Sequence, residues 1–480
     1  MELDYNKIGL RVGIEAHQQL DTSKLFCNCP SILRKDEPDF EVIRKLHAIA
    51  GESGEIDIAA QHEAELRKEF VYQGYDTTCL VELDEEPPHE INKEALMISL
   101  HIALLMNMRL VPITQIMRKT VIDGSNTSGF QRSVLIAQDG YVETSSRRVG
   151  IDYLYLEEDA ARIVEKGDKK DIYNLDRLGM PLVEIVTAPD VKTPEQAKEV
   201  ALYIGEILRS CKVRRGIGTI RQDVNISIRG ENRVEIKGMQ DMRIFIKVIE
   251  NEVLRQMRLS DKKNPTKMEV RNAQKDGSTR YMRPLPGSAR MYPETDLPLL
   301  RISRKMIDES RKTLPKMKKD IEKELEKEGL NKEMTSLLLK QNKIEEFKEL
   351  LNIISRPQII VKTLLIFPKE IARREKISLT KAEKILNKDV LSSVLENLKK
   401  GKIAENQIKQ VLENIVKGKS YKEALKIKKE DLHGIEKEII KLVKEKPGLS
   451  LNAYMGLIMK DFKGKISGKE VSEIIKKYVR

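Results

Sequence analysis

The sequence predicts an α+β protein in which a mixed-sheet domain is followed by helical domains. The first 300 or so of the 480 residues alternate short apolar strands with helices and hold most of the Gly-, Asn- and Asp-rich turns. Beyond Arg301 glycines become rare, and stretches such as KMKKDIEKELEKEGL and NKIEEFKELLNII are typical of charged amphipathic helices. A chain of this length is expected to form roughly three domains. We therefore predict a mixed α/β domain at about 1–300, a helical domain at about 301–400 and a small lysine-rich helical tail at about 401–480.

Composition indicates a soluble protein of the cytoplasm. The chain has no run of about 20 apolar residues, and its N-terminus, MELDYNKIGL, has neither a basic nor an apolar signal region. Four cysteines, two of them in the pair Cys27 and Cys29, are too few for a disulfide framework in a protein of this size. We therefore expect a cytoplasmic protein that does not enter a membrane.

Most of the formal charge of +12 lies at the C-terminal end of the chain. Residues 391–480 carry 21 lysines and arginines against 12 acidic residues, a net charge of +9. Lysines that neutralise phosphates release counterions, so this segment is a candidate for binding a polyanion such as RNA. A lysine-rich solvated helical surface would have the same composition, and composition alone does not decide between the two.

The first predicted strand, VGIEAHQQL at 12–20, has one apolar and one polar face. Alternate residues of a strand point to the same side, so Ile14 and Ala16 face a core while Glu15, His17 and Gln19 share the other surface. A solvated sheet face and a metal- or substrate-binding face would both have this pattern. The strand alone leaves both interpretations open.

A hairpin predicted in QDVNISIRGENRVEIKG repeats this pattern. Its turn is Gly-Glu-Asn, and its first strand carries Asp223 and Asn225 on the polar face. The returning strand carries Glu235 and Lys237 on the same kind of face. Solvated hairpins also carry alternating charges, so this pattern alone does not indicate a site. It does so only together with the other strands that carry acidic or titratable residues on their polar face.

Carboxylates occur inside apolar strands at two further places. Glu184 lies in PLVEIVTAPD, and Glu157, Glu158 and Asp159 end the apolar run YLYLEEDAAR. A carboxylate that is buried, charged and alone costs several kcal/mol, so it must be paired, protonated or bound to a metal. A cluster of several carboxylates is typical of a Mg²⁺ site, whereas the imidazole of His17 would also suit Mn²⁺ or Zn²⁺. Alternatively, these carboxylates form salt bridges in the core.

The predicted loop MRKTVIDGSNTSGFQR supplies cations and free backbone donors. Arg118, Lys119 and Arg132 flank a Gly-, Ser- and Asn-rich turn that suits phosphate or carboxylate oxygens. The loop is not a Walker A motif, because Phe-Gln stands where Lys-Ser/Thr is needed. RRGIGTIRQD likewise lacks the third glycine of a dinucleotide fingerprint. Acidic clusters beside a basic loop point to phosphoryl transfer or ATP-driven activation of a carboxylate.

One helix of the mixed domain is defined by its ends. In TPEQAKEVALYIGEIL, Thr193 is the predicted N-cap, Pro194 the first helical residue and Gln196 the partner in a capping box. The predicted buried stripe consists of Val200, Ile204, Ile207 and Leu208.

Seven collinear segments between residues 12 and 300 resemble one family, the glutamyl-tRNA(Gln) amidotransferase subunits of the archaeal E and bacterial B types, and more closely the E type. They are GIEAHQQLDTSKLFCNCP, CLVELDEEPPHEIN, MRKTVIDGSNTSGFQR, LEEDAAR, LDRLGMPLVEIVTAPD, RRGIGTIRQDVNISI and RPLPGSARMYPETDLP.

The resemblance implies a cradle-like catalytic domain and a two-step reaction on mischarged Glu-tRNA(Gln). ATP phosphorylates the γ-carboxylate of the tRNA-bound glutamate, and ammonia then displaces the phosphate. The ammonia would come from an asparaginase-like D subunit in a hetero-oligomer. The helical tail would contact the body of the tRNA.

The resemblance also assigns roles to individual residues. Catalytic positions are Glu15, His17, Lys119, Glu158, Glu184 and Asp223. The expected ligands of Mg²⁺, or of Mn²⁺, are Glu15, His17, Glu158, Glu184 and Asp223. Glu157 could take the place of Glu158. ATP or the tRNA 3′ end is assigned to Arg118, Ser125, Asn126, Asn225, Glu235 and Lys237.

Two departures from the family pattern affect these expectations. The E type usually carries a large inserted domain, and only about 20 residues, 260–280, occupy its place here. Some B-type subunits hold zinc with four cysteines, whereas only Cys27, Cys29 and Cys79 lie in the matching region, so buried thiols are expected rather than structural zinc. Two alternatives remain: a B-type subunit that also converts Asp-tRNA(Asn), and a catalytically silent tRNA-binding scaffold.

Overall fold

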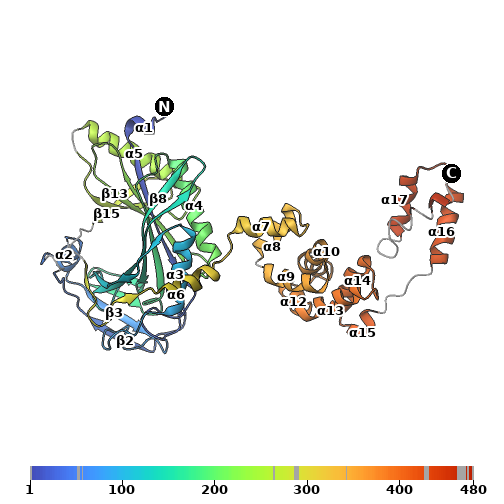
Figure 1. Ribbon diagram of the computed structural model, residues 1–480, viewed down its shortest axis with the longest axis horizontal. Helices are drawn as coiled ribbons and strands as arrows, with labels where there is room; N and C mark the ends of the chain where they lie inside the picture. The colour runs from blue at the N-terminus through green and yellow to red at the C-terminus, as the bar shows by residue number, and fades with distance from the viewer. Residues whose placement is uncertain are drawn as a thin grey trace. The chain divides into compact units, whose positions relative to one another are not determined.

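The computed structural model describes residues 3–50, 54–56, 58–262, 265–285, 291–341, 343–425, 432–461, 472 and 475–477. The chain divides into two compact units, Met1–Met317 and Lys318–Arg480 (Figure 1). The first unit is a mixed α/β structure and the second is helical, which confirms the predicted α+β class. Among the described residues, no helix combines the length and the hydropathy that crossing a membrane requires.

A large sheet of eleven strands forms the body of the first unit. Its strand order is β15-β14-β13-β12-β1-β11-β8-β7-β6-β16, with β4 paired to β7. Its described neighbours pair antiparallel, except that β13 and β14 are parallel. In chain order the strands are β1 (Arg11–Gln19), β4 (Arg109–Leu110), β6 (Ile116–Thr120), β7 (Phe130–Glu143), β8 (Arg148–Glu158), β11 (Pro181–Thr187), β12 (Ile220–Ser227), β13 (Val234–Lys237), β14 (Glu269–Ala273), β15 (Thr279–Pro284) and β16 (Met291–Pro293).

Helices pack against the apolar side of this sheet. Val12, Ile14 and Ala16 of β1 are fully buried in one core, as the alternation predicted. The helices that contribute to this core are α3 (Lys93–Leu105), α4 (Pro194–Ser210), α5 (Phe245–Asp261) and α6 (Arg304–Lys312). Because α6 packs on this core through Met306 and Ile307, the first unit continues past the boundary predicted near residue 300.

The helix predicted from its end signals is α4. Thr193 accepts a hydrogen bond from the backbone N–H of Gln196, and Pro194 is the first helical residue. The Gln196 side chain accepts from the N–H of Lys192 instead of closing the predicted box on Thr193. The predicted stripe is fully buried and consists of Val200, Ile204, Ile207 and Leu208.

A smaller four-stranded sheet lies in the same unit, in the order β2-β3-β10-β9. Its strands are β2 (Phe40–Arg44), β3 (Glu69–Gly74), β9 (Arg162–Lys166) and β10 (Lys170–Asn174). The Gly/Ser/Asn-rich loop approaches this sheet closely at Gly124, which has φ +88°. A Cβ there would overlap the ring of Phe70, so glycine is needed for both conformation and space. The unit also contains α1 (Tyr5–Ile8), α2 (Ile58–Glu65), and β5 (Ile113–Thr114) paired with β17 (Leu300–Arg301).

The second unit is helical and has two apolar clusters. The larger extends from Leu325 to Ala424, and therefore beyond the domain boundary predicted near residue 400. The smaller contains Ile439, Tyr454, Ile458 and Ile475. The α-helices are α7 (Lys318–Lys327), α8 (Lys332–Lys340), α9 (Ile344–Ile353), α10 (Pro357–Val361), α11 (Phe367–Arg374), α12 (Leu379–Ile385), α13 (Lys388–Lys399), α14 (Ile408–Val416), α15 (Tyr421–Ala424), α16 (Leu432–Glu445) and α17 (Leu451–Asp461). A π-helical turn spans Lys362–Ile366 and a 3₁₀ turn spans Glu405–Gln407.

The short segment 260–280 holds the end of α5, strand β14 and the start of β15. Glu252 of α5 ties this hairpin to the helix. Its carboxylate is 1% exposed and accepts hydrogen bonds from Arg255 at 2.8 Å, from Gln256 at 3.0 Å and from Thr279 of β15 at 3.0 Å. Arg271 of β14 lies 3.9 Å from it. One buried acid therefore joins α5, β14 and β15.

Replacing Glu252 by Ala is expected to lower the free energy of unfolding of the first unit by about 2 kcal/mol, since it removes the buried acceptor of Arg255, Gln256 and Thr279. Glu269, 3.1 Å from Arg255 and 2.9 Å from Arg271, still compensates the two arginines. Urea unfolding of the full chain measures this. Asp261→Asn, at the exposed end of the same helix, is the control and should stay within about 0.5 kcal/mol of wild type. Equal stability of Glu252→Ala and the control would show that the contact contributes nothing.

Candidate active site

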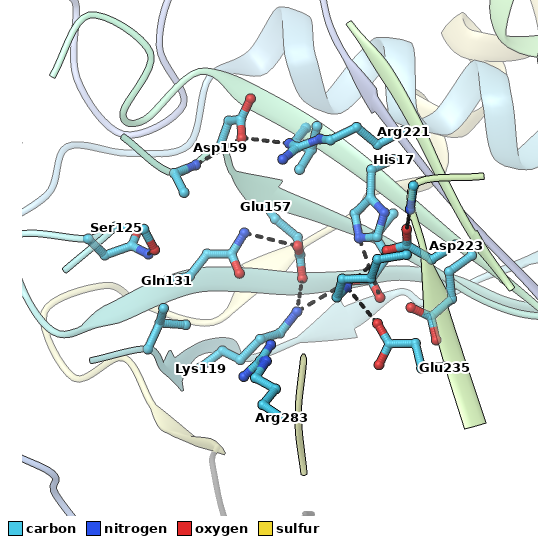
Figure 2. A pocket seen from close by; sticks show the side chains of 18 of the residues that line it. His17, Lys119, Ser125, Gln131, Glu157, Asp159, Arg221, Asp223, Glu235 and Arg283 are labelled. Atoms are coloured by element: carbon cyan, nitrogen blue, oxygen red, sulfur yellow. Dashed lines mark hydrogen bonds and ion pairs between the residues drawn. The ribbon is translucent and has the colours of Figure 1, made fainter. Parts of the chain in front are cut away.

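A cavity of about 440 Å³ lies on the polar side of the large sheet. Its walls come from strands far apart in the sequence: β1, β6, β7, β8, β11, β12, β13 and β15 (Figure 2). Among the described residues, six acidic and five basic side chains line it, together with His17. The predicted residues that line it are Glu15, His17, Lys119, Ser125, Asn126, Glu157, Glu184, Asp223, Glu235 and Lys237.

The position of β1 between β11 and β12 explains why its polar residues converge with others. Directly opposed residues of an antiparallel pair point to the same face. Glu15 pairs with Asp223 on β12, and His17 pairs with Glu184 on β11 and with Arg221 on β12. One register therefore brings five charged or titratable side chains to one surface.

Two groups of three side chains could each hold a divalent cation. In one, His17, Glu157 and Glu184 each place one ligand atom within 4.8 Å of the others. In the other, Glu15, Asp223 and Glu235 do the same. Carboxylate oxygens suit Mg²⁺ and Mn²⁺, and the imidazole of the first group is better suited to Mn²⁺.

Lys119 connects the first group. Its ammonium lies 2.5 Å from Glu157 and 3.2 Å from Glu184. Burial and the neighbouring Glu184 raise the pKa of Glu157 to about 7. Burial alone would raise the pKa of Glu184, but Lys119 holds it below its usual value. Burial lowers the pKa of His17, which keeps its ring neutral and available as a ligand.

Lys237 connects the second group. It lies 2.9 Å from Asp223 and 2.5 Å from Glu235. Burial alone would lower the pKa of Lys237, but the two carboxylates raise it above its usual value. Asn225 donates a 2.6 Å hydrogen bond to Glu15, so it acts on the site without lining the cavity. Burial, Glu184 and Glu235 together raise the pKa of Glu15 to about 7.

Gln19, which had no assigned role, supports the far end of the cavity. Its side chain is buried and donates a 2.6 Å hydrogen bond to Asp159. Asp159 also accepts from Arg221 at 2.7 Å and lies 3.7 Å from Arg177. Gln19 therefore orients the acid that pairs with a cavity arginine.

Besides Asn225, two further predicted site residues, Glu158 and Arg118, do not line the cavity. Consecutive strand residues face opposite sides, so Glu157 points into the cavity and Glu158 points away from it. Glu158 is buried 3.4 Å from Arg132, which also bonds Glu294 at 2.8 Å. Arg118 bonds the same Glu294, at 2.9 Å from its Nε, and its guanidinium lies 4.5 Å from the centre of the Phe130 ring. The structure thus places Glu158 and Arg118 in ion pairs outside the cavity, and their assignments to metal and to nucleotide stay predictions.

The structure also adds cavity residues beyond the predicted site residues. Gln131 opposes Lys119 across β6 and β7 and donates a 3.1 Å hydrogen bond to Glu157, so pairing of the two strands would have predicted it. Arg233 and Arg283 line the cavity from the end of the sheet that contains β13 and β15. The two-residue alternation of the returning strand puts Arg233 on the same face as Glu235 and Lys237, whereas no local pattern placed Arg283 near β1.

The three thiols near the N-terminus lie together with a fourth donor. Cys27, Cys29, Cys79 and Glu82 each place one ligand atom within 4.8 Å of the others, a donor set that zinc accepts. Glu82 already pairs with the buried Lys24 and accepts from the N–H of Cys79 at 2.8 Å. Hydrogen bonding from Cys27 lowers the pKa of Cys79 to about 5. The sequence indicates three possible zinc ligands here, and the structure adds Glu82 as a fourth.

Raised carboxyl pKa values in the cavity make the metal-free protein sensitive to pH. With a folded-state pKa near 7 against an ordinary 4.5, Glu15 favours folding when protonated, so its contribution is present below pH 4.5 and is lost as the pH rises through 7. Glu15→Gln should therefore be more stable than wild type above pH 7, by up to about 3 kcal/mol, and equal to it near pH 4.5. Urea unfolding of the full chain in EDTA measures this.

The matched control is Glu165→Gln, which neutralises an exposed carboxylate on β9. Its unfolding free energy should follow that of wild type at every pH. The same pH dependence in wild type and Glu15→Gln would contradict the assignment.

Comparison with known proteins identifies relatives along the whole chain. The E subunit of glutamyl-tRNA(Gln) amidotransferase from Methanocaldococcus jannaschii is 38% identical over 633 aligned positions, covering 100% of both chains. The protein of the same name from Archaeoglobus fulgidus is 36% identical, covering 100% of this chain and 99% of the relative. Because this chain has 480 residues, both relatives contain residues without a counterpart here.

A family model described as the GatB/GatE catalytic domain matches residues 10–308. This range contains all the strands that form the cavity. This chain therefore belongs to the GatB/GatE family of amidotransferase subunits.

Proposed function

We propose that this chain activates the glutamate carried by tRNA(Gln), using ATP, so that ammonia can convert it to glutamine. The observation that carries the proposal is the cavity in which two three-donor groups are joined to Lys119 and Lys237. The two archaeal relatives are both named as the E subunit of glutamyl-tRNA(Gln) amidotransferase, which favours this substrate over Asp-tRNA(Asn).

The donor groups fit a divalent cation, with Glu15, Asp223 and Glu235 on one side and His17, Glu157 and Glu184 on the other. A bound Mg²⁺ would supply electrostatic stabilisation of phosphate oxygens. Lys119 is placed to offset the negative charge that develops as the glutamate carboxylate attacks the γ-phosphorus and the bond to ADP breaks. Binding ATP and the glutamate of the tRNA in one cavity holds the two reacting groups in position, so that they react as if within one molecule.

The second step joins ammonia to the acyl carbon and releases phosphate with the electron pair of the broken C–O bond. The attacking nitrogen must lose a proton as the amide forms. A cavity carboxylate that is not bound to the cation suits this role, and each donor group offers more than one. We propose that the ammonia comes from a partner, an asparaginase-like D subunit in a hetero-oligomer.

The lysine-rich tail is proposed to bind the tRNA body. Lys437, Lys441 and Lys444 of α16 are exposed and follow the spacing of one helix face. Such lysines give salt-dependent affinity that does not distinguish sequences.

Replacing Glu157 by Gln should lower the rate of Glu-tRNA(Gln)-dependent ADP release by a factor of about 100 or more, because it removes a carboxylate from both Lys119 and the proposed metal site. The tRNA affinity should stay within twofold of wild type. Glu158→Gln makes the same change one residue along, outside the cavity, and should retain most of the activity.

Two outcomes of this experiment would contradict the proposal. Full activity of Glu157→Gln would exclude the assigned role of this carboxylate. A wild-type enzyme, assembled with its partner, that binds tRNA yet releases no ADP would identify the chain as a tRNA-binding scaffold.

Changing Lys437, Lys441 and Lys444 together to Gln should weaken tRNA binding and lower the slope of log affinity against log salt by about 2. Fluorescence anisotropy of labelled tRNA at several salt concentrations measures both. The rate at saturating tRNA should not change. An unchanged slope would show that these lysines do not contact phosphate.

A further inference from the structure

Most of the charge inside the cavity is already compensated. Lys119 pairs with Glu157 and Glu184, and Lys237 pairs with Asp223 and Glu235. Arg221 pairs with Asp159 at 2.7 Å. An incoming anion that used these three cations would compete with their carboxylates, which lie 2.5 to 3.2 Å away.

Arg233 and Arg283 are the two lining cations that lack such a partner among the described residues. In the part of the chain that the structure describes, neither guanidinium makes an ion pair or a side-chain hydrogen bond. Arg283 is half-buried, whereas Arg233 is exposed. A partly desolvated guanidinium without a carboxylate is costly to keep unless a ligand meets it.

Arg283 stands where two cavities meet. A second cavity of about 550 Å³ is lined by Arg221, Lys237 and Arg283, which also line the first. The second cavity adds Lys68 and Lys166 to these shared cations, and also the acids Glu63, Asp123 and Asp171. Asp171 lies 3.2 Å from Lys68 and compensates it. In the view of Figure 2, Arg283 is drawn toward the bottom of the cavity and Arg221 toward the top. Of the three cations that line both cavities, Arg283 is therefore the one without a carboxylate partner among the described residues.

We propose that Arg283 binds a phosphate group of the substrate, with Arg233 as a second, outer contact. The planar guanidinium fork presents two parallel N–H groups that match two phosphate oxygens, a geometry that the lysine ammonium does not have. Two phosphate sources fit this chemistry, the triphosphate of ATP and the terminal phosphodiester of tRNA. The inference rests on the proposed function, because that function requires both ligands to enter this cavity.

Binding measurements on the enzyme assembled with its partner test the inference without relying on turnover. One arm measures the affinity for a non-hydrolysable ATP analogue with Mg²⁺ by calorimetry. The other measures the affinity for tRNA without nucleotide. Arg283→Gln is expected to weaken one of them about tenfold or more, and the affected arm identifies the phosphate source.

Arg280→Gln is the matched control. Arg280 lies on the same strand, is exposed and lines neither cavity, so both affinities should stay within twofold of wild type. Arg283→Lys keeps the charge without the fork and should recover part of the loss. Thermal unfolding of each variant checks that the fold is intact.

The inference is overturned if wild type binds both ligands and Arg283→Gln binds both equally well. If wild type binds no nucleotide at all, the proposed function fails instead. The two failures are therefore distinguishable.

Discussion

The central strand β1 has hydrogen-bonded neighbours on both sides, and its two-residue alternation separates an apolar face from a polar one. Val12, Ile14 and Ala16 are buried against helices, while Glu15 and His17 face the cavity. A shift of one residue in register would bury the acids and expose the core residues. The same register therefore determines both the packing of the first unit and the chemistry of its cavity.

Buried carboxylates at this density require compensation, and the structure supplies it locally. Each donor group has one ammonium within 3.2 Å of two of its acids. Even so, the carboxyl groups of Glu15 and Glu157 are partly protonated at neutral pH, because burial raises the pKa of each. A divalent cation would replace those protons, so ligand binding and proton release are coupled in this cavity.

The sequence predicted much of the cavity because strand alternation is a local property. Glu15, His17, Glu184 and Asp223 needed only the correct period and one common register. The choice between Glu157 and Glu158 needed the phase of β8, which an acidic pair at the end of a strand does not reveal. Arg283 reaches its site through contacts between distant segments, and no local pattern encodes it. Glu82 is three residues from Cys79, but only the fold brings this pair to Cys27 and Cys29. The end of the first unit at Met317 depends similarly on how α6 packs.

The long separation between β1 and its neighbours has a consequence for synthesis of the chain. Glu15 and its partner Asn225 are 210 residues apart, and β11 also follows β1 by more than half the length of the first unit. Until β11 leaves the ribosome, β1 has neither of its final neighbours, and the second, β12, emerges later still. Late closure of this kind leaves the edges of β1 unpaired while β11 and β12 are still to be synthesised, and unpaired strand edges can pair with other chains.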